Sequence, residues 1–237
     1  MATMPAMRSN PLSLIDFHSH ILPGADHGSD SLTTSLYQLA LAREASIDRV
    51  VATPHFYPDR HTVEYFLAKR TRAYETLSPH LNGDLPEISL GAEVLICPGI
   101  DHMEGIEQLY ISGTNSILIE LPFSDFESSY CDVAYALAAR GANVILAHAD
   151  RYPKENIERM LDAGAKIQLN AASLAGMFRK KHLYTWLERD VVVALGSDIH
   201  GRDNKAYKKF TTATERIGSC AERIMQHSID ILNLKRC

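Results

Sequence analysis

DFHSHILPGADHG, residues 16–28, is the stretch of this 237-residue chain that decides its fold. It continues the largely apolar residues 12–15, and together they predict a β-strand that ends in polar side chains. Because successive side chains of a strand point to opposite faces, Asp16, His18 and His20 share one face. Two imidazoles at this spacing can bind one cation from the same side. An isolated His-x-His is more simply a solvated strand end, so the interpretation depends on what recurs along the chain.

An apolar strand that ends in His, Asp or Glu recurs along the whole chain. The predicted strands are residues 12–18, 49–53, 88–94, 116–122, 143–148, 165–169 and 191–195. The predicted helices run from a cap within residues 29–31 to about residue 45, and over residues 62–77, 128–140, 153–164, 179–189, 204–217 and 221–234. Strands rich in Val, Ile and Leu that alternate with helices indicate parallel β/α units whose sheet is buried on both faces.

Parallel strands collect their carboxyl ends at one side of an α/β barrel, where such folds build their sites. We therefore expect a distorted (β/α)7 barrel of TIM-like type, with a metal site at the C-terminal mouth of the strands. A flat doubly wound sheet is the alternative, but it would bring six separate strand ends to one point less readily. Since 46% of the residues are hydrophobic, we expect residues 12–237 to form a single domain that follows a flexible leader, residues 1–11.

Composition argues against several other classes of protein. The net charge of −5 is mild and both signs are interspersed, so no nucleic-acid partner is expected. No apolar run approaches 18 residues, and the first ten residues lack the apolar segment of a secretory signal, so no membrane insertion is expected. Four widely spaced cysteines favour free thiols in a reducing cytoplasm: Cys97, Cys131, Cys220 and Cys237. None has an Arg six positions later, which argues against a phosphatase that uses a Cys-x5-Arg thiolate.

Ten side chains at strand ends are candidate metal ligands. They are His18, His20, Asp26, His27, His55, Glu93, Glu120, His148, Asp198 and His200. They are too many for one ion and include no cysteine, whereas a structural zinc site uses about four ligands and usually cysteine. Imidazole combined with carboxylate suits Mn²⁺, Fe²⁺ and Zn²⁺. We expect two or three divalent ions about 3.5–4 Å apart, bridged by a carboxylate, which lower the pKa of a bridging water and supply a hydroxide nucleophile.

Taken in order, these motifs resemble those of the polymerase-and-histidinol-phosphatase (PHP) superfamily, and most closely its bacterial manganese-dependent protein-tyrosine phosphatases of the CpsB/YwqE type. The first motif is residues 16–28. The others are Ala-Thr-Pro-His at 52–55, Gly-Ala-Glu-Val at 91–94, Ile-Leu-Ile-Glu at 117–120, Ile-Leu-Ala-His at 145–148 followed by Arg151 and Tyr152, and Gly-Ser-Asp-Ile-His at 196–200. The resemblance covers about residues 14–215, and the ordered set is specific although each piece alone is weak.

The resemblance implies a distorted (β/α)7 barrel with three metal ions at its mouth. Mn²⁺ is the expected metal, with Fe²⁺ or Zn²⁺ as alternatives. It implies that the two closer ions are held by His18, His20, Glu93, Glu120, His148 and Asp198, with Glu93 as the bridge. It implies that the third ion is held by His55, His200 and one residue of the Asp26–His27 pair. Because the family has Asp-Asp-Gly where this chain has residues 26–28, Asp-His-Gly, we expect His27 to be the ligand in place of the usual Asp.

The resemblance also implies that Arg151 meets the substrate phosphate, with Tyr152 and Lys205 as further substrate-binding residues. Lys205 stands where the family often has Arg. The implied activity is that of a metal-dependent phosphomonoesterase, a protein-tyrosine phosphatase acting on the phosphotyrosine tail of a bacterial tyrosine autokinase that controls capsule and exopolysaccharide export. In the expected reaction a metal-bridging hydroxide attacks the phosphorus in line, and Arg151 and the metals stabilise the charge on the phosphoryl oxygens. Asp198 is then a candidate proton donor for an alkyl leaving group.

Three other functions fit parts of the same pattern. One is a phosphatase of small alkyl phosphates such as histidinol phosphate, a second is a metal-binding module without catalysis, and a third is a metal-dependent amidohydrolase. Two expectations concern neighbouring side chains. Asp16 is expected to orient the His18 imidazole, and aromatic residues after the strands either wall the cleft or pack loops: Phe56, Tyr57, Phe123, Phe126 and Tyr152. The sequence leaves the oligomeric state open.

Overall fold

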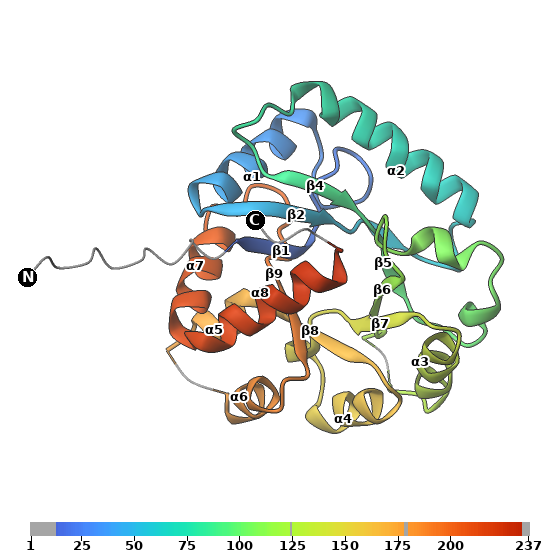
Figure 1. Cartoon of the computed structure of the whole chain (residues 1–237). Helices are drawn as coiled ribbons and strands as arrows, with labels where there is room; N and C mark the ends of the chain where they lie inside the picture. The colour runs from blue at the N-terminus through green and yellow to red at the C-terminus, as the bar shows by residue number, and fades with distance from the viewer. Residues whose placement is uncertain (1–12, 124, 178–179, 234–237) are drawn as a thin grey trace, which may run out of the picture.

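The computed structural model describes residues 13–123, 125–177 and 180–233, so the expected leader, residues 1–11, lies outside the described part of the chain. In the described part strands alternate with helices, the paired strands run parallel, and the helices lie outside the strands (Figure 1). The protein is therefore an α/β fold built on parallel sheets, as the alternating pattern predicts.

The strands form two sheets, with the orders β1-β2-β4 and β3-β5-β6-β7-β8-β9. Their bounds are β1 (Leu14–Ser19), β2 (Ile47–Ala52), β3 (His55–Phe56), β4 (Glu87–Leu90), β5 (Glu93–Leu95), β6 (Ser116–Glu120), β7 (Asn143–Leu146), β8 (Lys166–Asn170) and β9 (Val192–Gly196). Nine strands in the described residues thus stand where the sequence predicts seven.

The two additional strands arise where the chain passes from the first sheet to the second. The strand predicted at 88–94 divides into β4 and β5 at Gly91, whose N–H donates to the carbonyl of Ala52 at 2.8 Å. The N–H of Glu93 then donates to the carbonyl of Pro54 at 3.1 Å. Pro54 itself has no N–H to offer, so β2 ends before it and β3 begins after it.

The first and last strands meet at their carboxyl ends. The N–H of Asp198 donates to the carbonyl of His18 at 2.8 Å, and the N–H of His20 donates to the carbonyl of Ile199 at 3.3 Å. No ladder pairs β1 with β9 within the described residues. These two hydrogen bonds nevertheless bring His18, near the end of β1, and His20, just after it, beside the carboxylate after β9.

Seven of the described helices correspond to the predicted ones. They are α1 (Leu32–Glu44), α2 (Val63–Leu77), α3 (Ser129–Ala139), α4 (Lys154–Asp162), α6 (Lys181–Glu188), α7 (Ala206–Ile217) and α8 (Ser219–Ile231). Ser31 caps α1 by accepting from the N–H of Thr34, as Ser does at helix N-termini. The short α5 (Ala171–Ala175) is not predicted, and the weakly patterned residues 97–113 contain two 3-10 turns, Ile100–His102 and Ile106–Leu109.

The core lies between the sheets and the helices that surround them. Every residue of β6 and β9 is buried, as expected of strands covered on both faces. The largest fully buried side chains include Trp186, Phe17 and Phe210. In the described residues no helix combines the length and the apolar character that crossing a membrane requires.

Gly196 ends β9 at a point where there is no space for a side chain. A Cβ atom there would lie 2.6 Å from the Cβ of His18 and 2.6 Å from Nε2 of Gln168. We expect Gly196→Ala to lower the free energy of unfolding by about 1–3 kcal/mol, because these side chains must move. Urea unfolding of the metal-free protein measures this. Gly83→Ala is the matched control, since a Cβ at Gly83 meets nothing within 4 Å. Equal midpoints for the two variants would contradict the close packing.

Candidate metal centre

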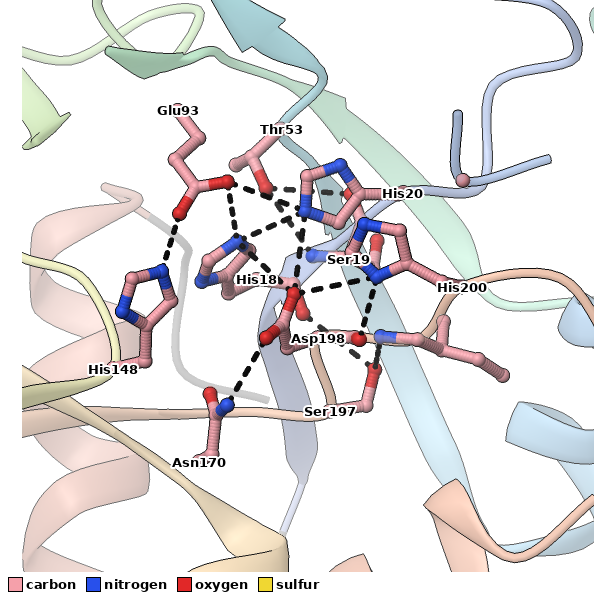
Figure 2. Close-up of polar contacts among 12 residues, drawn as sticks. His18, Ser19, His20, Thr53, Glu93, His148, Asn170, Ser197, Asp198 and His200 are labelled. Carbon is pink, nitrogen blue, oxygen red and sulfur yellow. Dashed lines mark hydrogen bonds and ion pairs between the residues drawn. The ribbon is translucent and has the colours of Figure 1, made fainter. Parts of the chain in front are cut away.

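The side chains predicted as ligands gather at the carboxyl ends of the strands, and several point toward one another in Figure 2. Eight of them form four groups in which the possible ligand atoms lie within 4.8 Å of one another. The groups are His20, His55 and His200; His18, His20 and Asp198; His18, Glu93 and His148; and His55, Glu93 and Glu120. Most of these side chains are buried. One buried cluster therefore contains candidate ligands from six of the predicted strands.

Glu93 lies at the centre of this cluster. Its Oε2 is 3.3 Å from Nε2 of both His18 and His20, and 2.9 Å from Nδ1 of His55. Its Oε1 is 2.6 Å from Nε2 of His148. Since Glu93 reaches ligands of separate groups with its two oxygens, it is placed as a carboxylate that bridges two ions would be.

The cluster suits cations because several of its buried ligand atoms face one another without a well-formed hydrogen bond. Nδ1 of His20 donates to the carboxylate of Asp26 at 2.7 Å, and Nδ1 of His200 faces the carbonyl of Asp198 at 3.0 Å. Nε2 of His20 is thereby turned toward the cluster, 3.3 Å from Oε2 of Glu93, and Nε2 of His200 is buried with no hydrogen-bond partner. Oε2 of Glu93 and Nδ1 of His55 are also buried and, although 2.9 Å apart, form no hydrogen bond of suitable geometry. Buried polar atoms in this state are costly, and divalent ions would satisfy them.

The pKa shifts within the cluster also favour the binding of cations. Burial alone would raise the pKa of Glu93, but the imidazoles of His18 and His148 hold this pKa well below its usual range. Burial alone would lower the pKa of His55, but the carboxylates of Glu120 and Glu93 raise it to about 9. Burial together with the nearby His20 lowers the pKa of His200 to about 4. The carboxylates therefore favour positive charge at the centre of the cluster, while His200 stays neutral and able to bind a metal.

Gln168, in the middle of β8, positions two of the histidines and was not predicted. Its Oε1 accepts from the backbone N–H of His148 at 2.7 Å and from Nδ1 of His18 at 3.1 Å. Because the backbone N–H can only donate, this atom is the amide oxygen, and His18 must carry its proton on Nδ1. Nε2 of His18 is thereby free to face the cluster, 3.1 Å from Nε2 of His20. The sequence marks Gln168 only as one polar residue in an ordinary strand.

We expect Gln168→Met to weaken metal binding about 10–100-fold, because outer partners of metal-binding histidines contribute this much. The methionine keeps the length of the side chain but cannot accept from His18. Titration of the metal-free protein with Mn²⁺ measures the effect. Gln226→Met is the matched control, since Gln226 donates to Asp230 within α8. Unchanged affinity in Gln168→Met would show that His18 is oriented without this amide.

The expectation for Asp16 is wrong. Its carboxylate does not contact the His18 imidazole but accepts from the backbone N–H of His18 at 3.3 Å and from the N–H and hydroxyl of Ser197 at 2.8 and 2.6 Å. Tyr207 on α7 donates to the same carboxylate at 2.9 Å. Burial raises the pKa of Asp16. Asp16 therefore holds the loop after β9, in which the next residue is Asp198.

Asp26 and His27 both lie beside the cluster, in different ways. The carboxylate of Asp26 accepts from His20 at 2.7 Å and also from the backbone N–H groups of Gly28 at 2.8 Å and His55 at 3.1 Å. The ring of His27 stacks 4.8 Å from that of His55 and lies 4.8 Å from that of His200. His27 belongs to none of the four groups among the described residues, so its role as a ligand stays a prediction.

A cavity of about 360 Å³ opens onto the cluster, and Arg151 lines it together with Asp198 and His200. The guanidinium of Arg151 pairs with the carboxylate of Asp198. Tyr152 is not among the described residues that line this cavity, and its hydroxyl donates to the carbonyl of Leu121 at 2.9 Å. Lys205 is exposed at the start of α7, where its N–H donates to Asp203 at 2.8 Å, and it is not among the described residues that line this cavity.

Comparison with known proteins agrees with this arrangement. Residues 14–234 match the model of the CpsB/CapC family of capsular polysaccharide synthesis. The chain belongs to this family. The match confirms the resemblance that the motifs carry.

Two relatives are named tyrosine-protein phosphatases. The chain is 28% identical over 197 residues to YwqE of Bacillus subtilis, covering 79% of this chain and 77% of that protein. It is 27% identical over 214 residues to CpsB of Streptococcus pneumoniae, covering 81% of this chain and 85% of that protein.

Solved structures extend the comparison to the fold. A crystal structure from work on YwqE and CpsB, described as metal-dependent tyrosine phosphatases, superposes with a TM-score of 0.75 at 20% identity, covering 94% of this chain and 96% of that chain. A β-aspartyl dipeptidase from Fervidobacterium islandicum superposes with a TM-score of 0.57 at 13% identity, covering 92% of this chain and 72% of that chain. At these identities the two matches concern the fold alone.

Proposed function

We propose that this chain is a metal-dependent phosphatase of phosphotyrosine that acts on a tyrosine autokinase in capsule and exopolysaccharide synthesis. The observation that carries the proposal is that a guanidinium, Arg151, and the buried cluster of imidazoles and carboxylates line one cavity. Such a pairing suits a phosphate monoester, whose dianion requires positive charge on several sides. The relatives named tyrosine-protein phosphatases support the same activity.

The residues that would hold two closer ions are those around Glu93: His18, His20, Glu93, Glu120, His148 and Asp198. His55, His200 and His27 would hold a third, with Mn²⁺ as the expected metal and Fe²⁺ or Zn²⁺ as alternatives. When bound, the ions neutralise phosphate charge and lower the pKa of coordinated water. Gln168 and Asp26 hold the imidazoles of His18 and His20, and Asp16 holds the loop that carries Asp198, so these three candidate ligands are positioned before substrate arrives.

Arg151 would bind the phosphoryl oxygens with the part of its guanidinium that does not pair with Asp198. Burial alone would raise the pKa of Asp198, but His18, His20 and Arg151 hold it well below its usual range. Asp198 therefore remains ionised, which suits a ligand and disfavours a proton donor. A phenolate leaves with a pKa of about 10 and requires little protonation, so this arrangement favours aryl over alkyl phosphates. The arrangement around Asp198 therefore gives no support to the alternative activity, a histidinol-phosphatase-like hydrolysis of alkyl phosphates.

We infer that the two sheets act together as one distorted barrel. The hydrogen bonds that link His18 with Asp198 and His20 with Ile199 support this, because they join the first strand to the last. We further propose that the chain works in the cytoplasm. Free Cys97, Cys131 and Cys220 are consistent with a reducing compartment, and Cys237 lies outside the described residues.

The proposal is tested by counting bound metal and measuring phosphate release in the same sample. We expect about two or three ions per chain, as in multinuclear phosphatases. Release of phosphate from a phosphotyrosine peptide should stop when a chelator removes the metal and return when Mn²⁺ is added. Release from phosphoserine should be much slower. A fully loaded protein that releases no phosphate from phosphotyrosine would overturn the proposal.

A further inference from the structure

The cavity above the metal cluster has a second, apolar part that the metal chemistry does not use. Beside the cluster residues and Arg151 it is lined by Tyr57, Leu95, Leu121, Pro122 and Phe123. A phosphate group alone needs none of these carbon-rich side chains. Ligand cavities combine a few polar groups with apolar walls that contact the rest of the ligand. The lining therefore indicates what is attached to the phosphate.

Phe123 is the most unusual of these side chains. It follows β6 by three residues, after the candidate ligand Glu120, and 81% of it is exposed. Phe17, Phe56 and Phe210, by contrast, are fully buried. One exposed aromatic ring is not informative by itself. Here the ring stands at the edge of the cavity that contains Arg151, where it can cover an apolar group next to the bound phosphate.

Tyr57 supplies a second aromatic wall, and its ring is held in place. The ring stacks on the imidazole of His55, with the centroids 5.2 Å apart and the planes at 16°. The guanidinium of Arg60 lies over the same ring, 5.1 Å from the centroid. Contacts of both kinds fix the orientation of an aromatic ring. Tyr57 is therefore a preformed surface two residues after a candidate ligand.

The backbone that carries Phe123 is held in place by Tyr152. The hydroxyl of Tyr152 donates to the carbonyl of Leu121 at 2.9 Å, and the rings of Tyr152 and Phe123 lie 6.4 Å apart. Phe123 also borders a neighbouring cavity of about 240 Å³, which Phe126 and Tyr152 line. The position of the segment is thus fixed while the Phe123 ring has space on both sides.

We propose that Phe123 and Tyr57 form an aryl subsite, which takes the phenyl ring of an aryl phosphate ester while Arg151 binds its phosphate. The inference rests on the proposed phosphatase function and adds the residues that select the substrate. A phenyl ring placed against two aromatic walls gains stacking and edge contacts as well as apolar burial. The methylene of an alkyl phosphate has no comparable surface, so it gains little from either wall.

The test measures binding of two phosphonates, which are not hydrolysed. Calorimetry gives the Kd of phenylphosphonate and of methylphosphonate for the Mn²⁺-loaded full chain. We expect Phe123→Ala to weaken phenylphosphonate about five- to tenfold and to change methylphosphonate by less than about twofold. Tyr57→Leu is the second variant and should shift the ratio in the same direction. Tyr135→Ala is the matched control, since Tyr135 lies on α3, is 66% exposed and lines neither cavity.

The outcomes separate the subsite from the phosphatase proposal. An unchanged ratio of the two Kd values in both Phe123→Ala and Tyr57→Leu would overturn the subsite, as would a wild type that prefers methylphosphonate. Phosphate release from phosphotyrosine is followed in parallel with the wild type. If release is absent but the ratio changes as expected, the phosphatase proposal fails while the subsite stands. If release is present and the ratio does not change, only the subsite fails.

Discussion

Glu93→Gln is expected to lower kcat/KM on phosphotyrosine by at least about 10³-fold, the largest effect among single substitutions of the cluster. The variant keeps the size of the side chain and removes its charge. An amide is a weak metal ligand and cannot bridge two cations with two anionic oxygens. The metal content of the purified protein should fall together with the activity.

The size of this effect follows from where the two oxygens of Glu93 lie. One oxygen is 2.9 Å from Nδ1 of His55, the other is 2.6 Å from Nε2 of His148, and these histidines belong to different groups. Glu120 belongs to one group only. We therefore expect Glu120→Gln to keep more metal and more activity than Glu93→Gln.

The measurement combines elemental analysis with initial rates over a range of Mn²⁺ concentrations. Glu158→Gln is the control, because Glu158 also accepts hydrogen bonds, from Trp186 at 2.9 Å and Arg189 at 2.7 Å, but takes part in none of the four groups. It should retain full metal content and rate. A Glu93→Gln protein that binds a full set of ions and turns over normally would show that Glu93 is not the bridge.

The convergence of the candidate ligands could be predicted from the sequence because the positions at which strands end can be recognised there. Val, Ile and Leu runs mark where strands stop, and parallel strands necessarily bring their carboxyl ends to one side. This is why His18 and His148, 130 positions apart in the chain, are both contacted by Gln168.

The partners of the ligands could not be predicted in this way. Alternation along a strand tells which face a side chain occupies but not which distant residue it meets. The expectation for Asp16 failed for a second reason, since the pairing of β1 with β2 shifts register between Asp16 and Ser19. Simple alternation does not hold across such an irregularity. Asp16 consequently contacts Ser197 and Tyr207, which are 181 and 191 positions away.

Loop residues were the least predictable. Lys205 was expected to bind substrate from its place in a motif, but the structure places it at the start of α7 and not in the cavity. Phe123, Tyr57, Phe56 and Tyr152 all follow predicted strand ends. Phe123 and Tyr57 line the cavity, whereas Phe56 and Tyr152 do not, and this difference arises from packing. The sequence gives no signal for that difference.

Arg151→Ala is expected to lower kcat/KM on phosphotyrosine about 10²–10³-fold while leaving the metal content unchanged. Arg151 ends a 3-10 turn, Ala149–Arg151, three residues after His148, and 41% of its side chain is exposed to the cavity and solvent. It supplies a forked donor for two phosphoryl oxygens. Because it is not a metal ligand, its loss should act on the phosphate and not on the ions.

Arg151→Lys distinguishes the charge from the shape of the side chain. Lysine restores one positive charge but not the planar fork, so we expect only part of the activity to return. Arg189→Ala is the matched control, since the side chain of Arg189 is 43% exposed and pairs with Glu158 outside the cavity. Its rate should equal that of the wild type.

Metal content decides between two roles of Arg151. The guanidinium pairs with Asp198, which also lies 3.7 Å from Nε2 of His18 and 3.4 Å from Nε2 of His20. If Arg151→Ala loses ions in proportion to activity, the main role of Arg151 is to hold Asp198 in the cluster. If the ions stay and phenylphosphonate binds more weakly, Arg151 meets the phosphate directly. We expect the second result, because Asn170 also donates to Asp198, at 3.1 Å, and keeps this carboxylate in place when Arg151 is absent.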